Sequence, residues 1–406
     1  MPRKSEFVLK DSPPEVIAAN PSVTPRGRSY DGRIAKKKAG AAKIDEILLG
    51  TKLGCIAVTD DKDNTLKEVA KMNPWHEVAL TTITGSVEEA HKPLTHILDK
   101  HFGLKLDHHL DITKMAGRIH SVDVQGYIAH NDDSIVVSFR CTTSAHDWMT
   151  NLAIASSEWE LDEDIAQGHS GLCSCFDGRF STFFGKRKTK PRVHTGFYNQ
   201  ILQVIPLLQK YVDPLLKADQ PPRTLYVTGH SLGAGISTMA ACYFLFEYDW
   251  GTLPHRLLNI SAGTPRSCKL SMSSLVEEKL SVLSPIEKAN IFRVVMDEDA
   301  VCRVPPERLG YSHVGRTIFL TEDGAVLVNP QLGLKFRNSG VSEEEIKKVR
   351  DANPVHDMGK EEEEEGTATE KYQKMVAKIP GLFRDHCPDC YLEPLVKLYE
   401  EEHKGS

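Results

Sequence analysis

Residues 225–241 read LYVTGHSLGAGISTMAA, and this stretch decides how the chain folds. A β-branched and aromatic run leads into the G-x-S-x-G pattern of residues 229–233, which is followed by small residues and an apolar helical pattern up to Phe246. The order predicts a strand, a sharp turn at Ser231 and a helix, which is the context that a nucleophile elbow needs. Glycine on both flanks of the turn lets the strand and the helix pass close to each other.

An elbow of this kind would expose the hydroxyl of Ser231 above the sheet, where it can act as a nucleophile. Because the helix begins at the serine, the N–H of Leu232 would point at the space where an oxyanion forms. We assign Gly229, His230 and Gly233 to the elbow itself. The alternative is a tight structural turn without chemistry.

The composition is that of a globular protein, with 406 residues of which 40% are hydrophobic and 26% charged. This length accommodates one large α/β domain with extensions, or two domains. The net charge of −6 gives no reason to expect nucleic-acid binding. The longest apolar run, 236–246, is about half the length that spans a bilayer.

Residues 1–43 are rich in proline, arginine and lysine and predict a disordered basic arm. The arm lacks the apolar stretch of a secretory signal, and nine cysteines without such a signal indicate reduced thiols. We therefore expect a cytoplasmic protein that is not secreted. The arm is either solvated or a tether that holds the protein at the periphery of an anionic membrane.

The rest of the chain predicts an α/β fold. Residues 44–120 have apolar residues at helical spacing and predict a helical N-terminal extension. Strands separated by helix-length segments then predict a largely parallel central sheet flanked by helices, with a hairpin at each end. The predicted strands are 122–129, 134–139, 225–228, 257–261, 291–295, 316–320 and 325–328.

Two insertions interrupt the main domain, which we place at 121–400. Residues 153–193 combine an acidic piece, a Gly/Ser/Cys-rich stretch and a basic cluster. So long a loop in a compact domain indicates a lid, a regulatory insertion or disorder, and we take it as a lid insertion. Residues 340–370 contain a run of five glutamates and predict a solvated acidic insertion.

A nucleophilic serine needs a histidine base within hydrogen-bond reach, and the histidine needs a carboxylate that orients it. Around sheets with this elbow the order along the chain is serine, acid, histidine. The loop after the strand 291–295 carries Asp297 and Asp299, and position alone leaves these two equivalent. The histidines that follow are His313, His356, His386 and His403.

Four blocks, in order along the chain, resemble the class 3 lipase family, the fungal-type branch of the α/β-hydrolase superfamily. They are VVSFRCTTSAHDWMTNL (136–152), VHTGF (193–197), the elbow (229–233) and DEDAVCRVPP (297–306). The resemblance runs from about residue 134 to 306, with a weaker echo at 380–395. The GHSLGAG form of the elbow is closest to intracellular, diacylglycerol-lipase-like members.

The resemblance implies a role for residues in each of these blocks. It makes Asp299 the catalytic acid, and it makes Thr142 with the N–H of Leu232 the oxyanion hole. His386, in the segment DHCPDCY, is similar to the late family segment that carries the base. His313 matches a family segment that looks structural, and it is the alternative base.

Cysteines give two further expectations. Cys141 stands where the family has glycine, so its Cβ would crowd the backbone that approaches the acyl group. Cys387 and Cys390 form a C-x-x-C pair, but the chain offers no convincing second pair at zinc-ligand spacing. We therefore expect no metal and no cofactor.

Together these features predict a carboxylic ester hydrolase that works through an acyl-serine intermediate. The resemblance to class 3 lipases implies that the ester is an acylglycerol or a phospholipid. We expect it to meet its substrate at a transient contact with a membrane or lipid-droplet surface. The alternatives are a catalytically silent lipase-like scaffold for protein interaction and a serine acyltransferase. The oligomeric state cannot be inferred from the sequence.

Overall fold

The computed structural model describes most of the chain between residues 43 and 403. The described ranges are 43–56, 74–116, 120–141, 156–159, 190–297, 299–305, 307–321, 326–328 and 385–403. Several predicted features lie outside the described residues: the arm except for Lys43, residues 153–155 and 160–189 of the lid, the acidic insertion, Thr142 and His356.

An eight-stranded sheet forms the centre of the molecule, in the order β1-β2-β3-β6-β7-β9-β11-β12. Strands β3, β6, β7, β9 and β11 run parallel, while the β1–β2, β2–β3 and β11–β12 pairs are antiparallel. The predicted, largely parallel sheet and both of its hairpins are confirmed. The strands are β1 (Lys105–Ala116), β2 (His120–His130), β3 (Ser134–Phe139), β6 (Thr224–His230), β7 (Arg256–Ala262), β9 (Ala289–Met296), β11 (Arg316–Leu320) and β12 (Val326–Val328).

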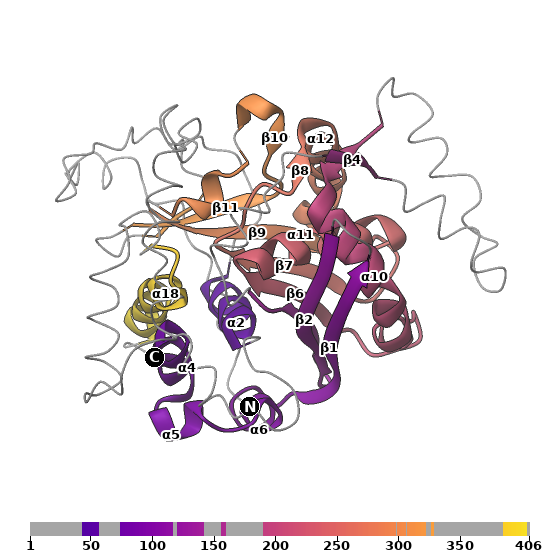
Figure 1. Ribbon diagram of the computed structural model, residues 1–406. Coiled ribbons are helices and arrows are strands. Elements are labelled where there is room, and N and C mark those ends of the chain that lie inside the picture. The colour runs from indigo at the N-terminus through magenta and orange to yellow at the C-terminus, as the bar shows by residue number, and fades with distance from the viewer. Residues whose placement is uncertain are drawn as a thin grey trace.

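A small antiparallel sheet in the order β10-β8-β5-β4 lies beside the large one (Figure 1). Its strands are β4 (Ser156–Glu158), β5 (Arg192–His194), β8 (Cys268–Lys269) and β10 (Tyr311–Ser312). Strand β4 begins and β5 ends close to the bounds of the predicted lid, so this sheet joins the two ends of that segment to the rest of the fold.

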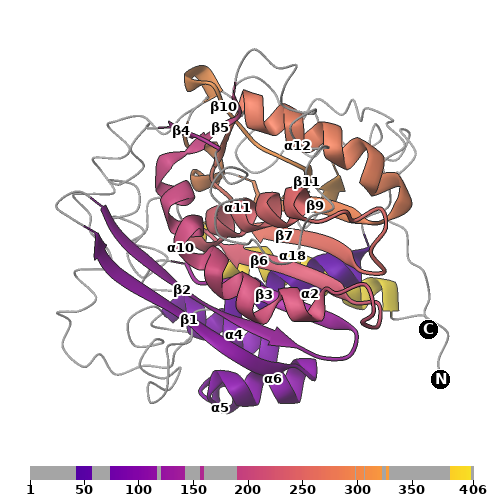
Figure 2. The same ribbon diagram turned by 90° about the vertical axis from the view of Figure 1, so that its right-hand side faces the viewer.

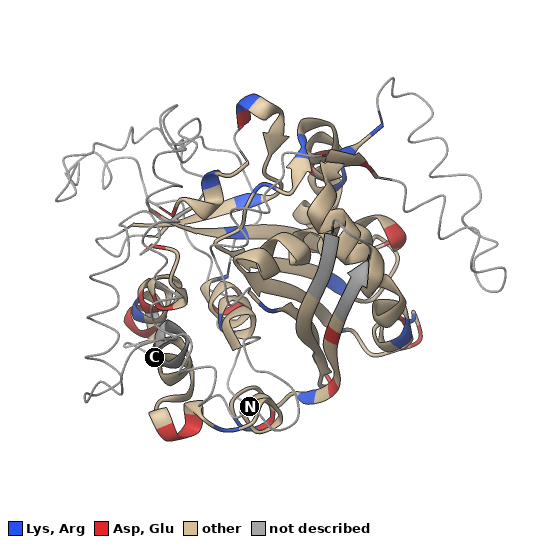
Figure 3. Ribbon diagram, viewed as in Figure 1, with Lys and Arg blue, Asp and Glu red and all other residues tan. Residues whose placement is uncertain are grey.

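Helices cover both faces of the large sheet (Figures 1 and 2). One face is covered by α10 (Thr195–Tyr211), α11 (Leu232–Glu247) and α12 (Leu270–Leu283), which share one apolar core with the sheet. A second core lies on the other face, under α2 (Ile44–Cys55), α4 (Pro74–Thr84), α5 (Val87–Ala90), α6 (Leu94–Phe102) and α18 (Pro388–His403). Segments from both ends of the described chain therefore pack together on this face. Figure 3 shows charged residues on the peripheral helices α5 and α18, whereas the central β6 and α11 carry almost none.

Helix α2 lies directly against the middle of the sheet, because two of its residues lack a side chain. A Cβ on Gly54 would lie 2.8 Å from Oγ1 of Thr228, and one on Gly50 would lie 2.5 Å from the side chain of Ile260. Hydroxyl groups from three neighbouring strands use this proximity and donate hydrogen bonds to carbonyls of α2. These bonds are Tyr127 to Leu53 (2.9 Å), Ser138 to Leu53 (3.0 Å) and Thr228 to Gly50 (2.6 Å).

The helical prediction for 44–120 is wrong for its last part, because residues 105–116 form the edge strand β1. The pairing register with β2 shifts between Leu106 and His108, which marks a β-bulge. The extra residue reverses which of the alternating side chains point to each face of the sheet. As a result Leu106 packs against the core under α2, while Leu110 and Ile112 belong to the core under α11. This one-residue shift hides the period-two pattern of a strand.

Candidate active site

Ser231 lies at the turn between strand β6 and helix α11, with φ 59° and ψ −122°. A non-glycine residue in this conformation costs on the order of 1–3 kcal/mol, and such strain is concentrated at functional sites. A Cβ on Gly229 would lie 2.5 Å from the carbonyl carbon of Gly233, so the turn requires glycine there. The predicted sequence of strand, turn and helix is confirmed, and Ser231 is 6% exposed.

Asp299 follows strand β9 and is completely buried. Its Oδ1 accepts a hydrogen bond of 2.8 Å from the N–H of Val301. Its Oδ2 accepts hydrogen bonds from Nδ1 of His386 at 2.8 Å, from the hydroxyl of Tyr391, and from the thiol of Cys302 at 3.5 Å. These donors take the place of water around the buried carboxylate.

Asp297, the other candidate from the sequence, lies two residues earlier in the same loop and is also buried. Its backbone N–H donates to the carbonyl of Leu320 at 2.9 Å, and its backbone carbonyl accepts from Arg303. The carboxylate that accepts the hydrogen bond of His386 is that of Asp299.

His386 lies two residues before the first residue of α18 and is 8% exposed. Because Nδ1 faces a carboxylate, Nδ1 carries the hydrogen of the neutral ring and Nε2 keeps its lone pair. This Nε2 is buried and has no hydrogen-bond partner among the residues that the structure describes. The ring therefore presents an unoccupied proton acceptor on the side away from Asp299.

The elbow and His386 are brought together at the end of strand β7. The backbone N–H of Ser231 donates to the carbonyl of Ala262 at 3.0 Å, and the next residue, Gly263, lies against the His386 ring. Gly263 has φ +64°, and a Cβ there would lie 2.8 Å from Cε1 of His386 and 3.3 Å from Oδ2 of Asp299. Sequence reasoning missed Gly263, although a glycine two residues after the predicted strand 257–261 was the available signal.

His313, the alternative base, makes a different contact. Its Nε2 donates to the backbone carbonyl of Cys302 at 2.8 Å. Burial lowers the pKa of His313 well below its usual range, and the nearby Arg293 and Arg266 lower it further. His313 thus supports the loop that carries Asp299, and the histidine that contacts the Asp299 carboxylate is His386.

Tyr391 and Cys302 are members of this site that sequence reasoning did not assign. Burial and the charge of Asp299 raise the pKa of Tyr391 well above its usual value, so its hydroxyl stays a donor. Burial, followed by the Asp299 charge, likewise raises the pKa of the Cys302 thiol. The signal for Tyr391 was its position one turn into the helix that His386 precedes.

Of the two residues expected to form an oxyanion hole, the structure describes Leu232. The N–H of Leu232 is the first of helix α11, and the first N–H groups of an α-helix have no acceptor within the helix. Cys141 follows strand β3 and is buried, which raises the pKa of its thiol to about 11. A Cβ on Gly233 would collide with the carbonyl of Phe139, so the elbow packs directly on the end of β3 where Cys141 follows.

No three histidine, cysteine, aspartate or glutamate side chains come together as a metal site within the described ranges. The side chains around Ser231 are those of acyl-transfer chemistry: a strained serine, a buried histidine with an unoccupied Nε2, and a buried carboxylate.

Residues 136–309 match the family model described as Lipase (class 3). This segment, called the lipase domain below, is similar to class 3 lipases over its whole length. The lipase domain contains Ser231 and Asp299, whereas His386 lies beyond its matched end. The chain is similar to "Secreted mono- and diacylglycerol lipase 1" of Fusarium solani, with 25% identity over 209 residues, which are 50% of this chain and 49% of that protein. The chain thus spans about half the length of the curated relative that it matches.

Two solved lipase structures resemble the chain more distantly. The mono- and diacylglycerol lipase from Aspergillus oryzae has 17% identity and a TM-score of 0.46, covering 74% of this chain and 91% of that one. The lipase from Rhizopus microsporus var. chinensis has 20% identity and a TM-score of 0.42, covering 70% and 86%. None of the helices that the structure describes is long and apolar enough to cross a membrane.

Proposed function

We propose that this chain is a serine hydrolase that cleaves carboxylic esters of lipids through an acyl-serine intermediate. The observation that supports it most directly is the 2.8 Å hydrogen bond from His386 to the buried Asp299, next to the strained Ser231. The lipase domain adds the family context for this chemistry.

In this proposal Ser231 attacks the ester carbonyl while Nε2 of His386 takes its proton. The imidazolium then gives that proton to the departing alcohol, which leaves Ser231 acylated. A water molecule attacks the acyl-serine with His386 again as base, and the carboxylic acid and the original serine are released. Asp299 holds the Nδ1–H tautomer and stabilises the imidazolium while it exists.

The negative oxygen of each tetrahedral intermediate would be stabilised by the N–H of Leu232 and by Thr142. Loss of one such donor typically costs about 3–4 kcal/mol in the transition state. The dipole of α11, whose N-terminal end begins at the elbow, acts in the same direction.

The substrate class we propose is an acylglycerol or a phospholipid, reached during a transient contact with a membrane or lipid-droplet surface, with residues 153–193 as a lid. Diacylglycerol is the first substrate to test, because the similar Fusarium solani protein is named a mono- and diacylglycerol lipase. That protein is also named secreted, so the cytoplasmic location stays a prediction.

The test is labelling with an active-site-directed fluorophosphonate, followed by peptide mapping of the modified residue and measurement of fatty-acid release from diacylglycerol. We expect the label on Ser231, no label in Ser231→Ala, and loss of both label and hydrolysis in His386→Ala. His313→Gln, which keeps a donor for the carbonyl of Cys302, should retain both.

Failure of the folded protein to react, with and without detergent to open a lid, would overturn the hydrolase proposal and favour the scaffold. Transfer of a labelled acyl chain to glycerol or lysolipid, in place of release as free acid, would identify an acyltransferase.

A further inference from the structure

His230 precedes Ser231 and is the last residue of strand β6. Its side chain is buried and turns toward the segment that carries His386. Nε2 of His230 donates a hydrogen bond of 2.9 Å to the backbone carbonyl of His386. The two imidazole rings also lie in contact, with centroids 4.7 Å apart and planes inclined by 31°.

The same ring meets Tyr391, at a centroid distance of 5.7 Å and an angle of 71°. Tyr391 and His386 both donate to Oδ2 of Asp299. His230 therefore contacts the backbone of His386, the ring of His386, and the second donor to the carboxylate that orients it.

The position of His230 in the fold makes this contact a rigid link. Its backbone is paired with strand β7 in the centre of the sheet, opposite Ala262. The segment of His386 joins the sheet from outside the matched lipase domain, at the beginning of α18. A hydrogen bond between two neighbouring buried groups of this kind fixes orientation, and a misplacement of 1 Å in a reacting group costs on the order of 100-fold in rate.

We infer that His230 is a positioning residue, which fixes the distance and tilt of the His386 ring relative to Ser231 by holding the backbone of His386 on strand β6. This inference rests on the proposed function. Because the acceptor is a backbone carbonyl, Nε2 of His230 must carry a hydrogen, and the residue donates without exchanging a proton with the substrate. Its contribution is to kcat and not to substrate binding.

Two substitutions separate the ring from the hydrogen bond. His230→Phe keeps an aromatic ring between His386 and Tyr391 but removes the donor, whereas His230→Gln removes the ring but places an amide N–H near the position of Nε2. The matched control is His255, a buried histidine whose Nε2 also donates to a backbone carbonyl, that of Lys217 at 3.0 Å. His255 directly precedes β7 and lies at the opposite end of the β6 and β7 strands from the elbow.

The measurements are kcat and KM for a short-chain ester, the second-order rate constant of fluorophosphonate labelling at Ser231, and the melting temperature. For His230→Phe we expect kcat and the labelling rate to fall on the order of 100-fold, with KM within about threefold of the wild type. His230→Gln should recover at least about tenfold of that loss. His255→Phe should lower the melting temperature but leave kcat per labelled site unchanged.

Different results would overturn the proposed function and the positioning role of His230. Absence of activity and labelling in the wild type would overturn the proposed function. An active wild type whose kcat and labelling rate are unchanged in His230→Phe would overturn the positioning role alone, as would a His255→Phe variant that loses kcat to the same extent.

Discussion

The side chains of His386 and Asp299 are joined by a 2.8 Å hydrogen bond although 87 positions separate them in the sequence. The bond connects the start of α18 to the loop after β9, so the C-terminal helix is part of the site. The lipase domain of residues 136–309 contains Ser231 and Asp299, whereas His386 lies outside it.

This bond predicts that Asp299 and Asp297 differ in their effect on catalysis. Asp299→Asn replaces a carboxylate by an amide that can present a donor to Nδ1 of His386, which favours the wrong tautomer. We expect kcat to fall by roughly 10⁴-fold, as for the same change in a Ser-His-Asp triad, while the protein stays folded. Asp297→Asn, in the same loop, should keep kcat within about tenfold of the wild type. Equal losses in the two variants would contradict the assignment of the acid.

A side chain at position 263 is expected to displace the ring of His386. This steric effect can be separated from the effect of backbone strain. A Cβ at φ +64° would lie 2.8 Å from Cε1 of His386, so Gly263→Ala must displace the ring. Gly103 has a nearly identical φ of +61° with no atom within 4 Å of a Cβ, so Gly103→Ala carries the strain alone. We expect both variants to lose about 1 kcal/mol or more of stability in urea unfolding. Only Gly263→Ala should lose kcat, and an unaffected kcat there would show that the ring is not confined by Gly263.

The hydroxyl of Tyr391 is predicted to stabilise the buried carboxylate. Tyr391→Phe removes one donor from Oδ2 of Asp299, and a hydrogen bond to a charged group contributes roughly 1.5–3 kcal/mol. We expect the free energy of unfolding to fall by about this amount in urea denaturation. Tyr399 lies on the same helix and is partly exposed, so Tyr399→Phe should change it by less than about 0.5 kcal/mol. An unchanged free energy of unfolding in Tyr391→Phe would mean that water replaces the hydroxyl.

The parts of the fold that could be predicted are those that local patterns determine. The strand before Ser231 and the helix after it follow from a continuous stretch of sequence, and the loop of Asp297 and Asp299 follows from one apolar strand. Within the sequence, only the resemblance to the class 3 lipase family distinguishes these two aspartates, because their positions after the strand are equivalent.

The remainder depends on contacts between distant segments. Strand β1 is concealed by its bulge near Asp107, since a single extra residue interrupts the period-two pattern. The roles of Gly263 and Tyr391 become visible only when β7 and α18 meet at Asp299. The docking of α2 depends on Gly50 and Gly54, and the need for glycine at these positions is set by side chains of the strands that they contact.

Helix α2 lies outside the matched lipase domain but is predicted to be essential for its stability. Replacing a helical glycine by alanine normally stabilises a helix by about 1 kcal/mol. In Gly54→Ala the new Cβ would lie 2.8 Å from Oγ1 of Thr228 and 3.1 Å from the backbone of Gly229, so the helix must move away from the sheet. We expect a net loss of about 1–3 kcal/mol in the free energy of unfolding. Lys52→Ala, a partly exposed position of the same helix, should be close to neutral, and stabilisation by Gly54→Ala would refute this packing.

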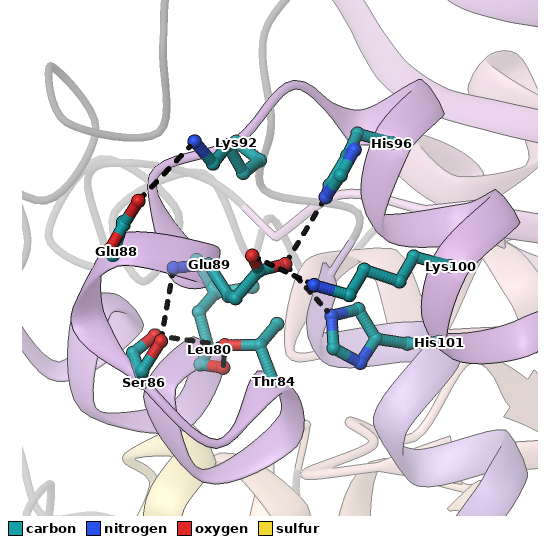
Figure 4. Close-up of polar contacts among 9 residues, drawn as sticks. All are labelled: Leu80, Thr84, Ser86, Glu88, Glu89, Lys92, His96, Lys100 and His101. Atoms are coloured by element: carbon teal, nitrogen blue, oxygen red, sulfur yellow. Dashed lines mark hydrogen bonds and ion pairs between the residues drawn. The ribbon is translucent and has the colours of Figure 1, made fainter.

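The carboxylate of Glu89 is expected to stabilise the N-terminal helices in a pH-dependent way (Figure 4). Its carboxylate on α5 lies 2.9 Å from Nζ of Lys100, 3.1 Å from Nε2 of His96 and 3.4 Å from Nε2 of His101, all on α6. Hydrogen bonds from Lys100 and then His96 lower the pKa of Glu89 to about 2, against an ordinary value of 4.5. Because the folded protein binds this proton more weakly than the unfolded chain, the stabilisation is complete above pH 4.5 and is lost as the pH falls towards 2.

Glu89→Gln should therefore lower the melting temperature above pH 4.5, and the difference from the wild type should shrink as the pH falls towards 2. Glu88→Gln is the matched control on α5, because Glu88 is 85% exposed and its nearest carboxylate oxygen is 3.8 Å from Nζ of Lys92. We expect this control to follow the wild-type curve at every pH, since exposed pairs contribute little. Melting temperatures measured by circular dichroism across this range provide the test. A Glu89→Gln curve parallel to that of the wild type would show that Glu89 contributes no proton-linked stability and that α5 and α6 are held together by their apolar contacts alone.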